Sequence, residues 1–172
     1  MKKFVIVLIV ALGLFSCQKS VKIAYIDVEE IMKEYKGTKD TEEAMKVKSD
    51  KLKLELDSLI SNWQNKAKAY QDNAPKMSAK ARAEREQSLM QEQQQINQRQ
   101  QTIQQQVQQE GQESLEALSN EISDFVKSYA KEKGYNFVLG TSGTSGTVIY
   151  GDEASDVTDE VLIQLNKSYK SK

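Results

Sequence analysis

The sequence predicts an α+β protein that is mostly α-helical, with a long antiparallel coiled-coil hairpin inserted into a small β-containing body. Two observations support this prediction. Apolar residues recur at heptad spacing on both sides of the single proline, Pro75, as in two helices that pack along a narrow seam. Beyond the first 16 residues, only about a third of the chain is apolar, against roughly 45–50% in ordinary globular domains. A seam needs less apolar material than a globular core.

The amino terminus, residues 1–16, has the features of a lipoprotein signal peptide. Lys2 and Lys3 precede an apolar run from Phe4 to Phe15, which is too short for a membrane helix of about 20 residues but suits a signal peptide. The run ends in Leu-Phe-Ser-Cys, with the only cysteine, Cys17, in last place, similar to a bacterial lipobox. We therefore predict lipid attachment at Cys17, and with it a membrane anchor. The alternative is a plain secretory signal with a chance cysteine.

Residues 17–28 are predicted to form a linker and the first strand of the body, because residues from Val21 to Val28 alternate in side-chain character. The hairpin is predicted over 29–134. Ile31, Met32 and Tyr35 begin its helical face, and beyond Gly37 the seam residues follow at steps of 7, 4, 3, 4 and 7. These first-helix seam residues are Met45, Leu52, Leu56, Leu59, Trp63 and Tyr70.

A turn is predicted near 73–78, around Pro75, with Ser78 as the amino-terminal cap of a second helix that ends at Gly134. The seam of this helix contains Leu89, Ile96, Ile103 and Val107. Between residues 87 and 112, 14 of 26 residues are glutamine. Such a tract suits a disordered segment, but glutamine is also a good helix former. Because the seam residues persist through the tract, we favour a solvated helix.

Residues 135–172 are predicted to return to the body as two short strands, Tyr135–Leu139 and Thr147–Tyr150, followed by a carboxy-terminal helix. A Gly-, Ser- and Thr-rich link separates the strands. Thr158 is the predicted cap of the helix, whose first turn is acidic. Three short strands and one helix bury little surface, so a unit of this kind commonly needs oligomerisation.

The composition argues against several functions. The chain has no histidine and one cysteine, which removes His-based catalysis, His-ligated zinc and Cys-cluster metal sites. A net charge of −1 argues against a nucleic-acid binder. We therefore expect neither an enzyme nor a bound metal or cofactor. A hydrolase using Ser, Asp and Lys would need a spaced constellation, and the sequence does not show one.

The sequence resembles the Skp/OmpH family of periplasmic chaperones for outer-membrane proteins over about residues 21–168. The similar stretches are Lys-Ile-Ala-Tyr-Ile-Asp at 22–27, the hairpin, Gly-Tyr-Asn-Phe-Val-Leu at 134–139 and Asp-Val-Thr-Asp-Glu-Val-Leu at 156–162. The resemblance implies a homotrimer in the periplasm whose three helical arms enclose a cavity for unfolded outer-membrane or envelope proteins. It also implies that neither a cofactor nor ATP takes part.

The chain departs from the family in two respects. Members are usually soluble after signal cleavage, whereas Cys17 predicts an anchor. Family arms are notably basic, yet residues 38–115 here hold 12 basic and 12 acidic side chains. Basic charge gathers near the predicted tip, as a candidate site for client protein or anionic lipid headgroups. The tip cations are Lys66, Lys68, Lys76, Lys80, Arg82 and Arg85; an ordinary solvated helix face is the alternative.

Two functions remain open at this point. The first is a holdase chaperone, to which Met45, Met77 and Met90 would offer adaptable apolar contacts; these methionines could equally be seam residues. The second is a structural or adaptor lipoprotein whose coiled coil spaces the cell envelope.

Overall fold

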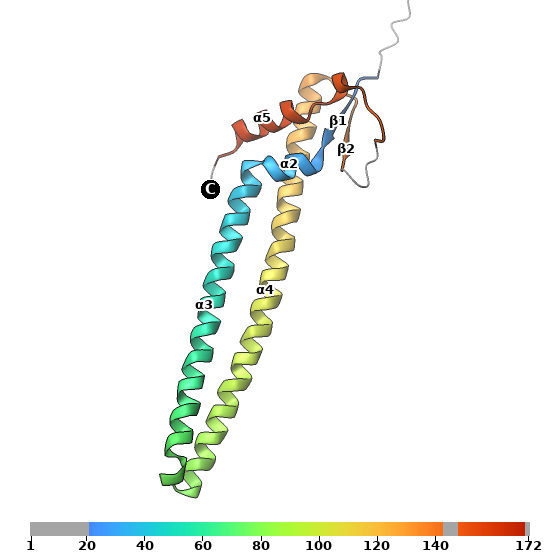
Figure 1. The fold of residues 1–172 in the computed structure, drawn as a ribbon. Helices are drawn as coiled ribbons and strands as arrows, with labels where there is room; N and C mark the ends of the chain where they lie inside the picture. The colour runs from blue at the N-terminus through green and yellow to red at the C-terminus, as the bar shows by residue number, and fades with distance from the viewer. Residues whose placement is uncertain (1–20, 143–147, 171–172) are drawn as a thin grey trace, which may run out of the picture.

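The computed structural model describes residues 21–142 and 148–170, and shows a long helical hairpin that extends from a small body (Figure 1). Residues 1–20, 143–147 and 171–172, which include the predicted signal peptide and Cys17, lie outside this description. The hairpin consists of α3 (Lys36–Asn73), η1 (Ala74–Lys76) and α4 (Ala79–Lys133). The body contains β1 (Ile23–Asp27), α2 (Val28–Glu34), β2 (Phe137–Thr141), η2 (Glu153–Ser155) and α5 (Thr158–Ser168).

The ends of the hairpin helices follow local sequence signals. The Ser78 side chain accepts a hydrogen bond from the backbone N–H of Ala81 and caps α4, as predicted. Gly134 closes α4 in the left-handed conformation, with φ of 72°, which favours glycine. Pro75 lies in η1, where the chain turns. At 1.5 Å per residue, the 38 residues of α3 and the 55 of α4 span about 57 and 82 Å.

The sheet of the body is parallel and joins the two ends of the hairpin. β1 pairs with β2 from Ile23↔Phe137 to Asp27↔Thr141, and the whole hairpin forms the crossover between the two strands. β2 begins two residues later than predicted, because the Tyr135 N–H still bonds to the Ala130 carbonyl of α4. The sheet therefore fixes the base of the hairpin to the body.

The predicted strand at 147–150 is not present in residues 148–150, and Thr147 lies outside the described residues. Ile149 and Tyr150 are 101% and 87% exposed. The chain then passes against β1 rather than along β2, since a Cβ on Gly151 would come within 2.3 Å of the Tyr25 ring. Asp156 and Val157 take the free edge of β1 instead. The apolar run Val-Ile-Tyr has strand propensity, but residues 148–150 pair with neither strand of the sheet.

The helix that begins after β1 is interrupted at Tyr35. The backbone of Tyr35 is extended, with φ of −67° and ψ of 130°, so α2 is separate from α3. The sequence predicts a hairpin arm over all of 29–134. In the structure Ile31 and Tyr35 are instead fully buried in the core of the body, and the break re-aims the chain from the body into the arm.

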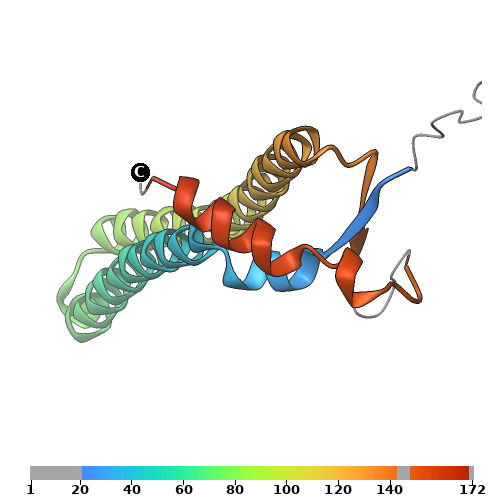
Figure 2. The same ribbon diagram turned by 90° about the horizontal axis from the view of Figure 1, so that it is seen from above.

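The core of the body collects apolar residues from α2, β1, the carboxy-terminal end of α4, and α5, which lies across the base of the hairpin (Figure 2). Ile31, Tyr35 and Val161 are completely buried, and Leu165 is nearly so. Thr158 is the first residue of α5 rather than its cap. Its hydroxyl accepts a hydrogen bond from the Asp27 N–H and donates one to the Asp156 carboxylate. The cap position of α5 is Val157, which offers no side-chain hydrogen bond. The Asp156 carboxylate accepts the Thr158 N–H, and Thr158 joins α5 to β1.

Candidate functional site

The hairpin seam is thin along most of its length. Of the ten predicted seam residues only Leu52 and Leu89 are buried, and Leu59 is exposed. The other seven are half-buried: Met45, Leu56, Trp63, Tyr70, Ile96, Ile103 and Val107. The indole N–H of Trp63 donates to the Leu89 carbonyl at 2.9 Å. The outer surfaces of both helices are therefore open to solvent over the length of the arm.

Three ion pairs cross the seam and join α3 to α4. They are Lys48–Glu110 at 2.6 Å, Arg99–Glu55 at 2.8 Å and Lys66–Glu92 at 2.8 Å. Hydrogen bonds from these cations lower the pKa of all three carboxyls. The pairs are largely solvated, so each contributes little. Together they flank the seam and favour one register of the two helices.

Acid is expected to loosen the arm. Each of the three carboxyls has a pKa below its unfolded value of 4.5. Their stabilisation is therefore complete above pH 4.5 and is lost as the pH falls through the lower, folded values. The melting temperature followed by the fluorescence of Trp63, the only tryptophan, should fall between pH 5 and pH 3.

A variant with Glu55, Glu92 and Glu110 all changed to Gln should show a much weaker acid dependence of that melting temperature. The matched control changes Glu42, Glu43 and Glu116, exposed glutamates outside the ion pairs of the described chain, and should keep the wild-type dependence. Equal pH profiles for the two variants would contradict the role given to the ion pairs.

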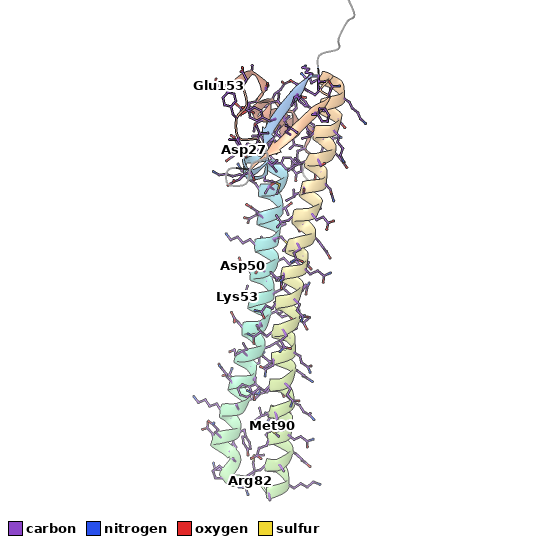
Figure 3. All side chains as sticks on the ribbon, turned by 90° about the vertical axis from the view of Figure 1, so that its right-hand side faces the viewer. Asp27, Asp50, Lys53, Arg82, Met90 and Glu153 are labelled. Atoms are coloured by element: carbon purple, nitrogen blue, oxygen red, sulfur yellow. The ribbon has the colours of Figure 1, made fainter. Side chains whose placement is uncertain are left out.

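The predicted tip cations lie on α3, η1 and α4 at the end of the hairpin farthest from the body, the end where Figure 3 labels Arg82. Lys66 is engaged with Glu92, and Lys80 lies 3.9 Å from Glu84. Arg85 is half-buried. The three remaining cations, Lys68, Lys76 and Arg82, are exposed. A role for these residues in binding client or lipid stays a prediction.

Apolar surface is exposed at the base of the arm more than along it. A cavity of about 700 Å³ lies between the sheet and α4, with Ile26, Val138, Ile122 and Val126 on its walls. On the arm, Met45 and Met77 are half-buried, whereas Met90 is 59% exposed. Of the three methionines offered as adaptable contacts, only Met90 presents most of its side chain to solvent.

The cross-seam ion pairs and the exposed face of the sheet were not predicted from the sequence. The ion pairs have a sequence signal, because opposite charges flank the seam positions of both helices in antiparallel order. The exposed face of the sheet has no usable sequence signal. Ile23 and Phe137 become neighbours only through the parallel pairing of strands 110 residues apart. Both residues are at least half exposed.

Comparison with known proteins identifies the relatives of this architecture. A family model described as "Outer membrane protein (OmpH-like)" matches residues 22–165, which includes both strands, the whole hairpin and most of α5. The chain belongs to this OmpH-like family. The predicted resemblance to the Skp/OmpH family is thereby confirmed.

The OmpH-like fold is also seen in a solved structure. A proposed outer membrane chaperone (OmpH-like) from Caulobacter crescentus CB15 matches with a TM-score of 0.78 at 16% sequence identity, over 88% of each chain. At that identity the likeness concerns the fold alone. None of the curated proteins that were searched matches the chain.

The described residues of this OmpH-like chain lack both a membrane-crossing helix and a cluster of metal ligands. None of the helices there combines the length and the apolar character that crossing a membrane requires. Likewise, no group of three or more His, Cys, Asp or Glu side chains within residues 21–142 and 148–170 could hold a metal ion.

Proposed function

We propose that this OmpH-like protein is an ATP-independent holdase chaperone that binds unfolded outer-membrane or envelope proteins in the periplasm. The observation that carries the proposal is the family match over 22–165, since the OmpH-like family supports a chaperone role and implies a periplasmic location. Nothing in the described residues favours the alternative, a structural or adaptor lipoprotein.

The arm suits a mechanism based on many weak contacts. Its two helices bury only a narrow seam and leave their outer faces to solvent. Several arms around one unfolded client would act at high effective concentration, so weak contacts suffice. A protein that binds the unfolded state in preference to the folded one delays aggregation without an energy source.

We also propose that the working unit is a homotrimer, with self-association through the sheet. β2 has an open edge within the described residues, and open edges readily pair with another chain. Beside that edge, one face of the sheet exposes Ile23, Phe137 and Leu139. Exposed apolar patches of this kind mark interaction sites.

The holdase proposal predicts that the purified protein, without ATP, suppresses the light scattering of a urea-unfolded outer-membrane barrel protein after dilution. Suppression should be complete at about one trimer per client. A Phe137→Asp variant should be monomeric by light-scattering mass measurement and should lose most of the suppression. A monomer has only one arm, so it lacks the high effective concentration that several arms around one client provide.

The matched control is Ile163→Asp, which also places a charge at an exposed apolar residue of the body, 68% exposed on α5. It should keep both the mass and the activity of the wild type. If the wild-type protein leaves aggregation unchanged, the holdase proposal is wrong; if it suppresses aggregation as a monomer, only the trimer proposal fails.

We further propose that Cys17 carries the lipid anchor that tethers the chaperone to a membrane. The support is the sequence alone, in which only Ser16 separates the cysteine from the apolar run. Cells grown with labelled palmitate should incorporate label into the wild-type protein but not into Cys17→Ala, while Cys17→Ala remains in the periplasmic fraction. Equal labelling of the two proteins would refute the anchor.

A further inference from the structure

The glutamines of α4 contain a regular pattern that the composition of the tract does not reveal. Starting at Gln87, eight glutamines follow one another at alternating steps of four and three residues and end at Gln112. We call these eight residues the glutamine stripe. All of them are exposed, and the hydrogen bonds of the described chain leave their side-chain amides without a protein partner.

The stripe runs along the side of α4 that faces away from α3. Gln87 and Gln91 lie two residues before and after the seam residue Leu89, and the same relation places Gln94 and Gln98 around Ile96. Two residues correspond to about 200° around an α-helix, so each pair flanks the point opposite the seam. The stripe is therefore a second heptad line on the arm, made of amides instead of apolar side chains.

The surface around the stripe carries no free charge. Between residues 87 and 112 the charged side chains are Glu92, Arg99 and Glu110, and each is paired with a residue of α3 across the seam, at 2.8, 2.8 and 2.6 Å. Of the large apolar side chains in this range, only Met90 is more than half exposed. This face of the arm is thus neither ionic nor apolar.

Such a surface is chemically matched to an extended polypeptide backbone. Each glutamine amide offers two donors and one accepting oxygen, and a backbone offers uncharged N–H and C=O groups. Pairing them requires no desolvation of an ion. From Gln87 to Gln112 the helix rises about 38 Å, the length of about 11 residues of β-strand. A membrane-spanning β-strand has about 9–11 residues.

We propose that the glutamine stripe binds one extended segment of an unfolded client through hydrogen bonds to the client backbone. This inference rests on the proposed holdase function and names its recognition chemistry. The heptad line continues toward the body through Leu115, which is exposed, and Ser119, on the wall of the cavity between the sheet and α4. A client strand longer than the stripe therefore meets apolar surface where the amides end.

Two glutamine-to-alanine variants of equal size test the proposal in the full-length protein. The stripe variant changes Gln94, Gln98, Gln101 and Gln105; the flank variant changes Gln93, Gln95, Gln100 and Gln104, which are also exposed but lie off the stripe. Alanine is the better helix former, so both variants should keep the wild-type circular dichroism. Both should also keep the oligomeric state of the wild type, measured as the mass of the assembly in solution. The probe is a fluorescein-labelled 11-residue peptide that alternates Thr with Val, Leu or Tyr.

The stripe variant should bind this peptide at least tenfold more weakly than the wild type, and the flank variant within twofold of it. The loss should persist in 0.5 M NaCl, because it involves no charges. A peptide N-methylated at alternate backbone amides should bind the wild type as weakly as the plain peptide binds the stripe variant. Combining the two changes should cause little further loss, since both remove the same hydrogen bonds.

Each contrary result has a definite meaning. Equal affinities of the stripe and flank variants overturn the inference, and so does a loss that N-methylation does not reproduce, which would assign the contacts to client side chains. A changed mass of the stripe variant overturns it as well, because the stripe would then join copies of this chain. If the wild-type protein suppresses aggregation in any of these cases, the holdase proposal survives; if it does not, both fall.

Discussion

Replacement of Tyr35 by alanine is expected to lower the free energy of unfolding of the body by about 3–5 kcal/mol, the range for loss of a buried aromatic side chain. Tyr35 is completely buried at the break between α2 and α3. Its ring meets the Tyr169 ring edge-on, 5.5 Å between centroids, and its hydroxyl donates to Glu121 of α4. The Tyr35 ring also packs against Gly37, where a Cβ would come within 2.4 Å of the ring. Any larger residue at position 37 would therefore clash with Tyr35.

Two further variants separate packing from hydrogen bonding at Tyr35. Tyr35→Phe keeps the ring and loses only the hydroxyl, at an expected cost of about 0.5–1.5 kcal/mol, because the exposed Glu121 regains water. Tyr150→Ala removes an exposed tyrosine of the same body and should change stability by less than about 0.5 kcal/mol. Urea denaturation followed by near-ultraviolet circular dichroism measures all three. If Tyr35→Ala lowers the free energy of unfolding no more than Tyr35→Phe does, packing of the Tyr35 ring does not stabilise the break between α2 and α3.

Leu89→Ala is expected to destabilise the arm by about 2–5 kcal/mol, the range for a buried leucine, and to leave the body nearly unchanged. Leu89 is one of the two buried seam residues, and its carbonyl accepts the Trp63 indole N–H. The arm touches the body only at its base (Figure 1), so the loss should remain local. Trp63 fluorescence should therefore report unfolding at clearly lower urea concentration than in the wild type.

The matched control for the arm is Leu54→Ala, which removes the same side chain from an exposed position of α3. It should shift the Trp63 transition by less than about 0.5 kcal/mol. The body is followed in parallel through its tyrosines in near-ultraviolet circular dichroism. If that signal moves together with Trp63 fluorescence in Leu89→Ala, arm and body unfold as one unit and the separation assumed here is wrong.

Local signals accounted for the parts of the fold that were predicted well. Heptad spacing, Pro75, Ser78 and Gly134 specify helix faces and ends through contacts within a few residues, and the structure places the turn, the cap and the helix end there. The errors occur where distant segments compete. The stretch at 148–150 has the side chains of a strand, but Asp156, later in the chain, pairs with the outer edge of β1 instead. Thr158 was predicted to cap α5, but its hydroxyl accepts a hydrogen bond from the Asp27 N–H of β1 instead.

In the candidate site too, some features could be predicted from the sequence, and others depend on contacts between distant segments. The tip cations and the glutamine tract could be located from sequence, because their positions along two long helices follow from residue number. Which cations remain exposed depends on pairs such as Lys66–Glu92, which join residues 26 apart across the seam. The exposed face of the sheet depends on pairing between segments more than 100 residues apart.

Helix periodicity is a property of neighbouring residues, so the helical hairpin, its turn, its seam and the stripe of amides opposite that seam follow from local sequence in this protein. The tertiary structure decided the break at Tyr35, the parallel pairing of β1 with β2, and which apolar residues stay exposed on the body. Those features result from competition for a few strand edges and one small core, in which each segment's place depends on all the others.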